Sequence, residues 1–329
     1  MANVALSFAI NPYDHVRDLL DGSVRAEGID FTFLRIQTEE IFFRFVRFQE
    51  WDVSEMAFGK LVARISRGDQ RIVAIPVFPS RVFRHSSLYV RADSGITEPA
   101  QLAGKRIGLP TWSQSASMYS RGMLADEYGL DLGSVHWHQA GVNQPGREEN
   151  VDLELPSWVR LTRVKDRSLS QMLLAGELDA VLSARPPAPF TAGDPRIRRM
   201  FEDYKSVELA YWKKTGIFPI MHVVAMRREV YERHRWIAMN IFSALEAAKN
   251  RSLERLKGMT ESTLPLPWIP DQTILPRQML GEDFWPYGIE PNRKTLEAFT
   301  RYAYEHGVAA RKLSVEELFV PEVQSFTRV

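Results

Sequence analysis

Short apolar runs alternate with helical segments along this chain, and that alternation limits the fold more than any other feature of the sequence. Residues 3–10 and 28–36 have strand-like patterns, and the continuous apolar run 71–78 is typical of a buried parallel strand. Residues 12–22 and 38–50, which lie between them, have apolar side chains at helical spacing. The first part of the chain is therefore expected to fold as β-α-β-α-β.

The same alternation restarts after Asp93. Residues 98–110 read as a short helical turn that runs into a strand, and residues 117–130 read as a helix. Another strand is expected at 159–166, and 168–187 reads as a helix closed by a glycine and followed by a strand. Two α/β units in succession predict two sheets, with the ligand site in the cleft between them.

The last third of the chain predicts a strand, a long helix and a final helix that pack back on the first unit. The chain would then cross between two lobes twice, near residues 88–93 and 206–224. The lobe boundaries that follow are 1–89 plus 213–329 for the first lobe and 90–212 for the second.

Composition excludes several classes of function. The 329 residues carry 42 basic and 41 acidic side chains, so the chain has no overall electrostatic field that favours binding to nucleic acid or to a membrane surface. No apolar run approaches the roughly 18 residues of a membrane span, and the N-terminus lacks a basic signal region, so we expect a cytoplasmic protein. The absence of cysteine excludes thiolate chemistry. Whether the chain forms a homo-oligomer is left open.

One short polar segment between two apolar runs is a candidate site. It contains Arg81, Arg84, His85, Ser86 and Ser87. The planar guanidiniums match carboxylates, the hydroxyls can bind further oxygens, and an imidazole exchanges protons near neutral pH. The alternative interpretation is a solvated loop whose charges pair with nearby acids.

Two further residues follow predicted strands. His222 ends an apolar run on the second crossing, where it could serve as an acid or base or simply be a satisfied buried histidine. Arg185 follows a strand expected to end at the cleft, so it is a candidate carboxylate clamp or a surface arginine before a polyproline turn.

Loops at two predicted helix starts supply the remaining candidates. Ser113 and Ser115 could bind a carboxylate together with backbone amides, although N-capping also explains serines there. Trp112 could stack on an aromatic ligand or belong to the core, and Tyr13 occupies the corresponding loop of the first lobe. No metal site is expected: His136 and His138 form an isolated pair without a third ligand.

Six segments in order along the chain resemble the 4,5-dihydroxyphthalate decarboxylase family. They are "EEIFFRFVRFQEWDVSEMAFG", "VAIPVFPSRVFRHSSLYVRADSGI", "GKRIGLP", "RGMLADEYG", "KTGIFPIMHVV" and "FWPYGIEPNRKTLEAF". The resemblance implies a two-lobed fold like that of type II periplasmic binding proteins. It also implies cofactor-independent loss of carbon dioxide from a hydroxylated aromatic dicarboxylate, with 4,5-dihydroxyphthalate giving protocatechuate.

In that chemistry His85 is expected to donate the proton, with His222 as a partner acid or base and the arginines holding a carboxylate. The resemblance departs in "PTWSQSAS" from Pro110, where Thr111 and Trp112 replace an acid and a tyrosine. Two alternatives therefore stay open: the same chemistry on a different hydroxybenzoate or phthalate, and a non-catalytic solute-binding protein or sensor on the same scaffold.

Overall fold

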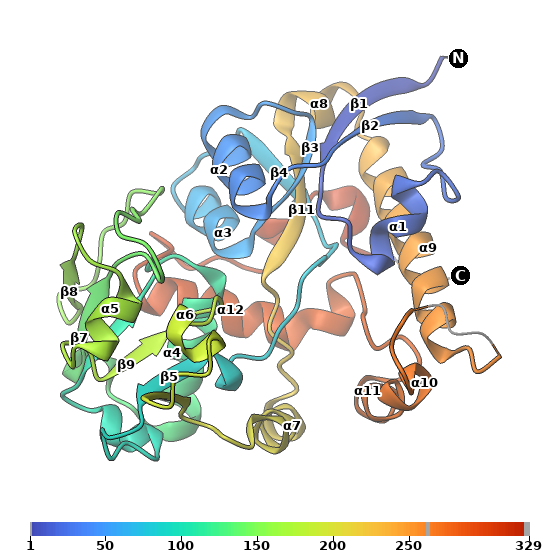
Figure 1. Ribbon diagram of the computed structural model, residues 1–329. Helices are drawn as coiled ribbons and strands as arrows, with labels where there is room; N and C mark the ends of the chain where they lie inside the picture. Colours follow the sequence, from blue (N-terminus) through green and yellow to red (C-terminus); the bar gives the residue numbers. More distant parts are fainter. Residues whose placement is uncertain (1, 261–263, 326–329) are drawn as a thin grey trace.

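Two separate β-sheets form the framework of the protein, so the predicted α/β class is confirmed (Figure 1). The structure is a computed structural model that describes residues 2–260 and 264–325. Strands before residue 76, together with one late strand, build the first sheet, and the strands between residues 88 and 199 build the second. The exact lobe boundaries given above stay a prediction.

The first sheet has the strand order β2-β1-β3-β11-β4. Its last strand in the chain, β11, returns from the second lobe and lies between β3 and β4, antiparallel to both. The predicted parallel pairing of the run 71–78 is therefore wrong: β4 is fully buried, but its neighbour runs the other way. The sequence interpretation also missed β3 and α3. The elements are β1 (Val4–Ala9), α1 (Asp14–Leu20), β2 (Ile29–Leu34), α2 (Thr38–Phe48), β3 (Val53–Ala57), α3 (Phe58–Ser66), β4 (Ile72–Ile75) and β11 (His222–Arg227).

The second sheet has the order β10-β5-β9-β6-β7-β8, in which β9, β6, β7 and β8 are parallel. A capping box at Ser168 starts α5. The elements are β5 (Leu88–Arg91), β6 (Arg106–Leu109), α4 (Ser115–Tyr128), β7 (His136–Gln139), β8 (Arg160–Arg163), α5 (Leu169–Leu174), β9 (Ala180–Leu182), α6 (Ala188–Thr191) and β10 (Ile197–Arg199).

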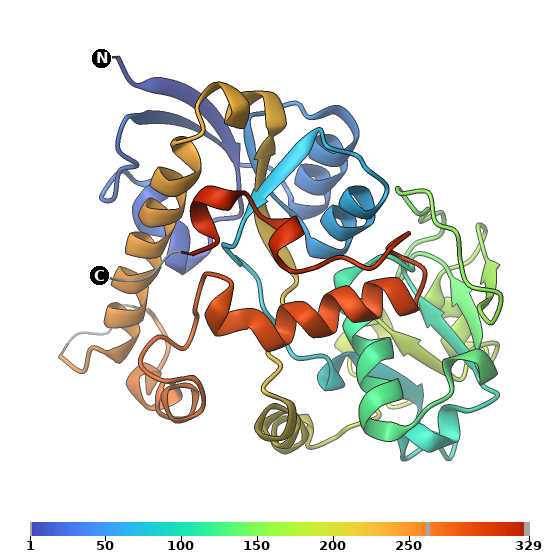
Figure 2. The same cartoon turned by 180° about the vertical axis from the view of Figure 1, so that it is seen from behind.

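The C-terminal helices pack back on the first lobe, as expected. Helix α9 lies along α1, and α12 runs across the back of the molecule in contact with both α3 and α4 (Figure 2). Helix α12 therefore links the two lobes. No helix in the described part of the chain is both long and apolar enough to cross a membrane. The remaining helices are α7 (Tyr204–Thr215), α8 (Arg228–Arg233), α9 (Ile237–Lys257), α10 (Ile269–Gln272), α11 (Ile274–Leu280) and α12 (Arg293–Glu305).

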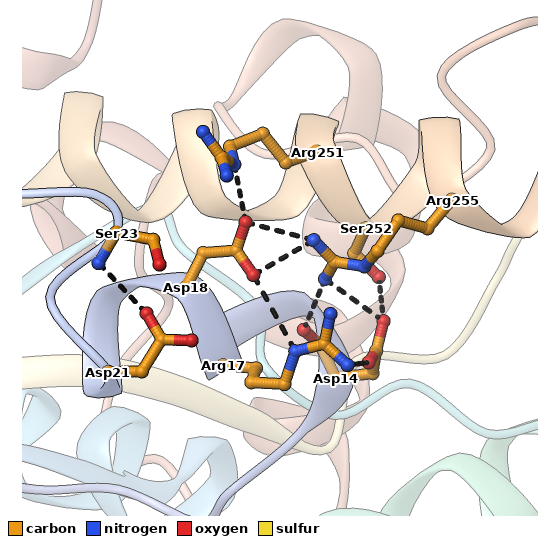
Figure 3. A network of polar contacts seen from close by, with 8 residues as sticks. All are labelled: Asp14, Arg17, Asp18, Asp21, Ser23, Arg251, Ser252 and Arg255. Carbon is orange, nitrogen blue, oxygen red and sulfur yellow. Dashed lines mark hydrogen bonds and ion pairs between the residues drawn. The ribbon is translucent and has the colours of Figure 1, made fainter. Parts of the chain in front are cut away.

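A network of charges fixes α1 on α9 (Figure 3). Asp18 is 2% exposed and accepts hydrogen bonds from Arg251 and from Arg255, the latter at 2.8 and 2.9 Å. Burial opposes ionisation of Asp18, but the two arginines outweigh it, so the pKa of this carboxyl lies below its usual range. Because α1 begins directly after Tyr13, the network also fixes the position of that loop.

Replacing Asp18 by Asn should lower the free energy of unfolding by about 1–3 kcal/mol at pH 7, because a buried acceptor of charged hydrogen bonds is lost. A depressed pKa stabilises the fold only where the carboxyl is ionised, so the difference from the wild type should shrink as the pH falls below about 4. Urea unfolding of both proteins across this range measures it. Asp21→Asn, on the exposed end of α1, is the matched control and should stay within about 0.5 kcal/mol. Equal stability of Asp18→Asn and wild type would contradict this account.

The two lobes touch where α3 meets the start of α4. The hydroxyl of Ser115 accepts a hydrogen bond from the Gly59 amide at 3.0 Å and donates one to the Met221 carbonyl, also at 3.0 Å. A β-carbon on Gly59 would lie 2.3 Å from the backbone oxygen of Ser113. Only glycine therefore allows this approach of the lobes.

Gly59→Ala should push the lobes apart, because neither backbone segment at the contact can yield easily. Small-angle X-ray scattering should then show a larger radius of gyration than that of the wild type. Gly258→Ala serves as a control, since a β-carbon there meets its nearest atom at 3.4 Å, an ordinary van der Waals distance. An unchanged radius for a folded Gly59→Ala protein would show that this contact does not hold the lobes together.

Candidate active site

A pocket of about 400 Å³ lies between the two lobes. The first lobe contributes the start of α2, the β3–α3 junction and the start of β11, whereas the second contributes the start of α4 and two loops. The lining residues are Thr38, Glu39, Phe42, Phe43, Ala57, Lys60, Arg84, Thr111, Gln114, Ser115, Ala116, Arg147, Asn150, Ala184, Arg185, Met221 and His222.

A buried carboxylate orients His222 at one wall of this pocket. Glu55, whose side chain is fully buried, lies 2.6 Å from the Nδ1 atom of His222 through its Oε1 atom. The same oxygen accepts a hydrogen bond from the Tyr13 hydroxyl at 2.6 Å, and Oε2 accepts two from Asn11. Phe42 packs edge-on against the imidazole. These contacts leave the Nε2 atom of His222 as the ring nitrogen available to a ligand.

Glu55 is ionised despite its burial. Burial alone would raise the pKa of Glu55, but His222, Tyr13 and Asn11 outweigh it and hold the pKa below its usual range. Tyr13 is the reverse case: burial, reinforced by the charge of Glu55, raises the pKa of its phenol. Glu55 is therefore a carboxylate and Tyr13 a neutral phenol. Both contact the imidazole of His222, and they can support proton transfer at its Nε2 atom.

The part of the pocket lining at the start of α4 can bind an anion. The side chain of Gln114, the N-cap residue of α4, accepts a hydrogen bond from the Ser117 hydroxyl at 3.2 Å but makes no capping bond to the first amides of the helix. The first amides of a helix lack intrahelical acceptors and carry partial positive charge, so those of Ser115 and Ala116 suit a carboxylate. Arg84 lines the same pocket, 7% exposed, with Nε 3.2 Å from the sulfur of Met221. In the described ranges, 2–260 and 264–325, no carboxylate pairs with Arg84.

Lys60 carries a third buried charge at the pocket. It pairs with Glu149 and also contacts the hydroxyl of Ser113, whose amide donates to Glu149 at 3.1 Å. Burial lowers the pKa of Lys60, although the carboxylate of Glu149 opposes the shift. This cluster joins α3 of the first lobe to a loop of the second, so it helps to close the pocket rather than to bind a ligand.

His85 lies outside the pocket. It is 1% exposed, and its ring is packed edge-on against Tyr211, Phe201 and Tyr128. Neither ring nitrogen has a hydrogen-bond partner within the described residues, and burial lowers the pKa of His85 to about 4. Its imidazole is therefore neutral at pH 7 and enclosed by aromatic rings, which gives no support to its expected role as the proton donor.

Arg81 and Trp112 also lie away from the pocket. The guanidinium of Arg81 donates to the carbonyls of Phe218 and Pro286, at 2.9 and 3.3 Å, and joins the two crossing segments. Trp112 is fully buried, donates to the carbonyl of His306 at 2.7 Å and packs under Arg121. Neither side chain is free to contact a ligand in this pocket, so the expected clamp and stacking contacts are not found.

The other predicted residues fall into two groups. Arg84, Arg185, Ser115 and His222 line the pocket, as does Thr111 of the loop that departs from the family pattern. The rest lie behind the pocket lining. The hydroxyl of Tyr13 donates to Glu55, that of Ser113 accepts from Lys60, and that of Ser87 accepts from Arg84 at 3.4 Å. The amide of Ser86 donates to Glu208 at 3.0 Å.

Sequence reasoning missed Glu55, Lys60, Glu39 and Arg147. Glu55 and Lys60 had a usable signal, because each is a single charge inside an otherwise apolar strand or helix. Glu39 and Arg147 are exposed and carry no such signal. Within the residues that the structure describes, no group of three or more histidine or carboxylate side chains could hold a metal. The strand that carries His136 and His138, β7, is an inner strand of the second sheet, because β6 and β8 both pair with it.

Two of the solved structures similar to this protein are sulfonate-binding proteins. The aliphatic sulphonate binding protein SsuA from Escherichia coli superposes with a TM-score of 0.55 at 12% identity, covering 98% of this chain and 99% of that one. A putative sulfonate-binding SsuA from Methylobacillus flagellatus gives 0.53, also at 12% identity, over 98% and 93% of the two chains. These likenesses concern the fold alone, and they confirm the predicted type II periplasmic-binding-protein architecture.

Sequence relatives carry a more specific name. A 4,5-dihydroxyphthalate decarboxylase from Comamonas testosteroni is 37% identical over 328 residues, which is 99% of each chain. A protein of the same name from Pseudomonas putida is 39% identical over 204 residues, 62% of this chain and 79% of its own length. No family model matches the sequence. Identity of this extent over the full length shows that the chain is an enzyme of the 4,5-dihydroxyphthalate decarboxylase family.

Proposed function

We propose that this protein converts 4,5-dihydroxyphthalate into protocatechuate and carbon dioxide in the pocket between its lobes, with His222 as the proton donor. The family supports the reaction. The observation that carries the assignment to this pocket is that His222, held by Glu55, lines it together with cationic groups and the first amides of α4. A dianionic aromatic ring with phenolic hydroxyls matches this combination of an imidazole with cations and amides.

The reaction exchanges a carboxylate for a proton at one ring carbon. That carbon lies para to a hydroxyl, whose oxygen donates electron density and helps the carbon to accept the proton. The carbon–carbon bond then breaks, its electron pair returns to the ring and restores aromaticity, and the carboxylate leaves as carbon dioxide. One proton is consumed for each carbon dioxide released, so the protein must supply a positioned acid.

The residues that line the pocket divide these tasks. The Nε2 atom of His222 delivers the proton, while the ionised Glu55 on Nδ1 fixes the ring and balances its charge. Arg84 and the first amides of α4 hold the carboxylate that stays on the ring. The lobes enclose the pocket, which limits water around these charges and strengthens their interactions.

This assignment moves the proton donor from His85 to His222. His222 lines the pocket and contacts a carboxylate, whereas His85 does neither. That the reaction needs no cofactor stays a prediction from the family resemblance, as do the oligomeric state and the cytoplasmic location.

His222→Asn should lower turnover of 4,5-dihydroxyphthalate by about 10²–10⁴-fold, because the amide can still contact Glu55 but cannot transfer a proton as an imidazole does. His85→Phe is the matched variant. It should keep turnover within about threefold, since phenylalanine suits the aromatic surroundings and His85 has no hydrogen bond to lose in the described part of the chain. Chromatography of protocatechuate, with carbon dioxide measured in parallel, follows both variants.

The opposite pattern would contradict the assignment. If folded His85→Phe lost turnover and His222→Asn kept it, the proton would come from the buried aromatic cage and the expectation from sequence would stand. If the wild-type protein released no carbon dioxide from this substrate, the proposed reaction itself would be refuted.

Arg84→Gln should weaken binding of phthalate, which has both carboxylates but no hydroxyl to react, by roughly 10- to 100-fold, because a charged hydrogen bond in a buried site is lost. Arg199→Gln is the control: Arg199 is also partly buried, but its guanidinium contacts the carbonyl of Ser86 and lies outside the pocket. Isothermal titration calorimetry measures both affinities. Unchanged phthalate binding by Arg84→Gln would place the ligand elsewhere.

A further inference from the structure

Glu39 joins two arginines of the second lobe at the mouth of the pocket. It lies in the first turn of α2 in the first lobe, and its Oε1 atom is 3.3 Å from a guanidinium nitrogen of Arg147 and 3.3 Å from one of Arg185. All three residues line the pocket between the lobes, and they also line a neighbouring pocket of about 380 Å³. Glu39 therefore lies at the boundary between the two pockets.

These ion pairs are weak enough to exchange. The side chains of Glu39, Arg147 and Arg185 are 56%, 37% and 66% exposed, and pairs this exposed contribute about 0–1 kcal/mol each. Within the described residues, Glu39 is the sole carboxylate within 4.0 Å of either guanidinium. A carboxylate that enters the pocket can therefore replace it on both arginines at little cost.

The substrate offers a carboxylate for this exchange. Its two carboxylates occupy adjacent ring carbons, so a ligand held by Arg84 and α4 through one of them keeps the second nearby. Arg147 and Arg185 are the further cations of the lining, because Lys60 is already buried against Glu149. The second carboxylate thus meets two guanidiniums that are held in place by Glu39.

We propose that Glu39 is a specificity-determining residue that occupies the second carboxylate position while the pocket is empty, and that a dicarboxylate binds by displacing it. This inference rests on the proposed function, since it requires the substrate in this pocket. A monocarboxylate uses the wall of Arg84 and α4 alone and leaves Glu39 on its arginines. Glu39 therefore acts on the binding of dicarboxylates and has little effect on monocarboxylates.

The exchange also favours product release. Protocatechuate retains one carboxylate and cannot occupy both cationic positions, so Glu39 returns to Arg147 and Arg185 once carbon dioxide has left. The pocket then binds the product less tightly than the substrate. Substrate binding breaks the ion pairs of Glu39 with Arg147 and Arg185 across the two lobes, and product release forms them again. The chemical step is therefore coupled to the making and breaking of these ion pairs at the pocket mouth.

The test compares Glu39→Gln with Glu40→Gln, its neighbour on the same helix, which pairs with Arg44 at 2.8 Å and does not line the pocket. Calorimetric titrations with phthalate and with benzoate are made at low ionic strength. Glu39→Gln should bind phthalate roughly three- to tenfold more tightly than the wild type, while benzoate affinity changes less than twofold. This gain in phthalate affinity should become smaller at high salt, because the ion pairs of Glu39 that compete with the ligand are exposed and therefore screened. Glu40→Gln should match the wild type with both ligands.

Weaker or unchanged phthalate binding by Glu39→Gln would overturn the inference, since Glu39 would then orient the arginines or play no part. An equal gain in affinity for benzoate and phthalate would also overturn the inference, because removing one negative charge from the pocket would then favour any anion. The Arg84→Gln titration separates this failure from that of the proposed function. If Arg84→Gln does not weaken phthalate binding, the pocket is not the site, whereas weakening by Arg84→Gln without tightening by Glu39→Gln refutes the role of Glu39 alone.

Discussion

The burial of one carboxylate, Glu55, is the constraint on which the site depends. An ionised carboxylate inside a protein is costly unless hydrogen bonds and opposite charge compensate for its lost hydration. Here the compensation comes from two parts of the first lobe: Asn11 and Tyr13 from the loop after β1, and His222 from the start of β11. Satisfying Glu55 therefore fixes a histidine at the pocket wall, and the same contacts connect the site to the order of strands in the sheet.

The second requirement is close approach of the lobes. Gly59 and Ser115 bring backbone from both lobes together, the Lys60–Glu149 pair closes one side, and α12 spans the back. An imidazole oriented by a carboxylate thereby lines the same pocket as Arg84 and the start of α4.

Much of the fold could be predicted from the sequence, because hydrophobic periodicity is local and the alternation of strands and helices was clear. The strand order was not predictable, since β11 enters the first sheet about 150 residues after its neighbour β4, and no local pattern reveals that pairing. The site was predicted in part. His222 and Arg84 lie where expected, but Arg81 and His85 look the same in sequence and are buried for structural reasons. Residue type shows what a side chain can do, whereas packing decides which ones meet a ligand.

A crystal structure of the protein with bound phthalate tests the central claim most directly. The account predicts phthalate in the pocket between the lobes, one carboxylate on Arg84 and the amides that start α4, and the Nε2 atom of His222 about 3–3.5 Å from a ring carbon that bears a carboxylate. Phthalate bound elsewhere, or bound in this pocket with its carboxylates turned away from Arg84 and its ring out of reach of His222, would contradict it.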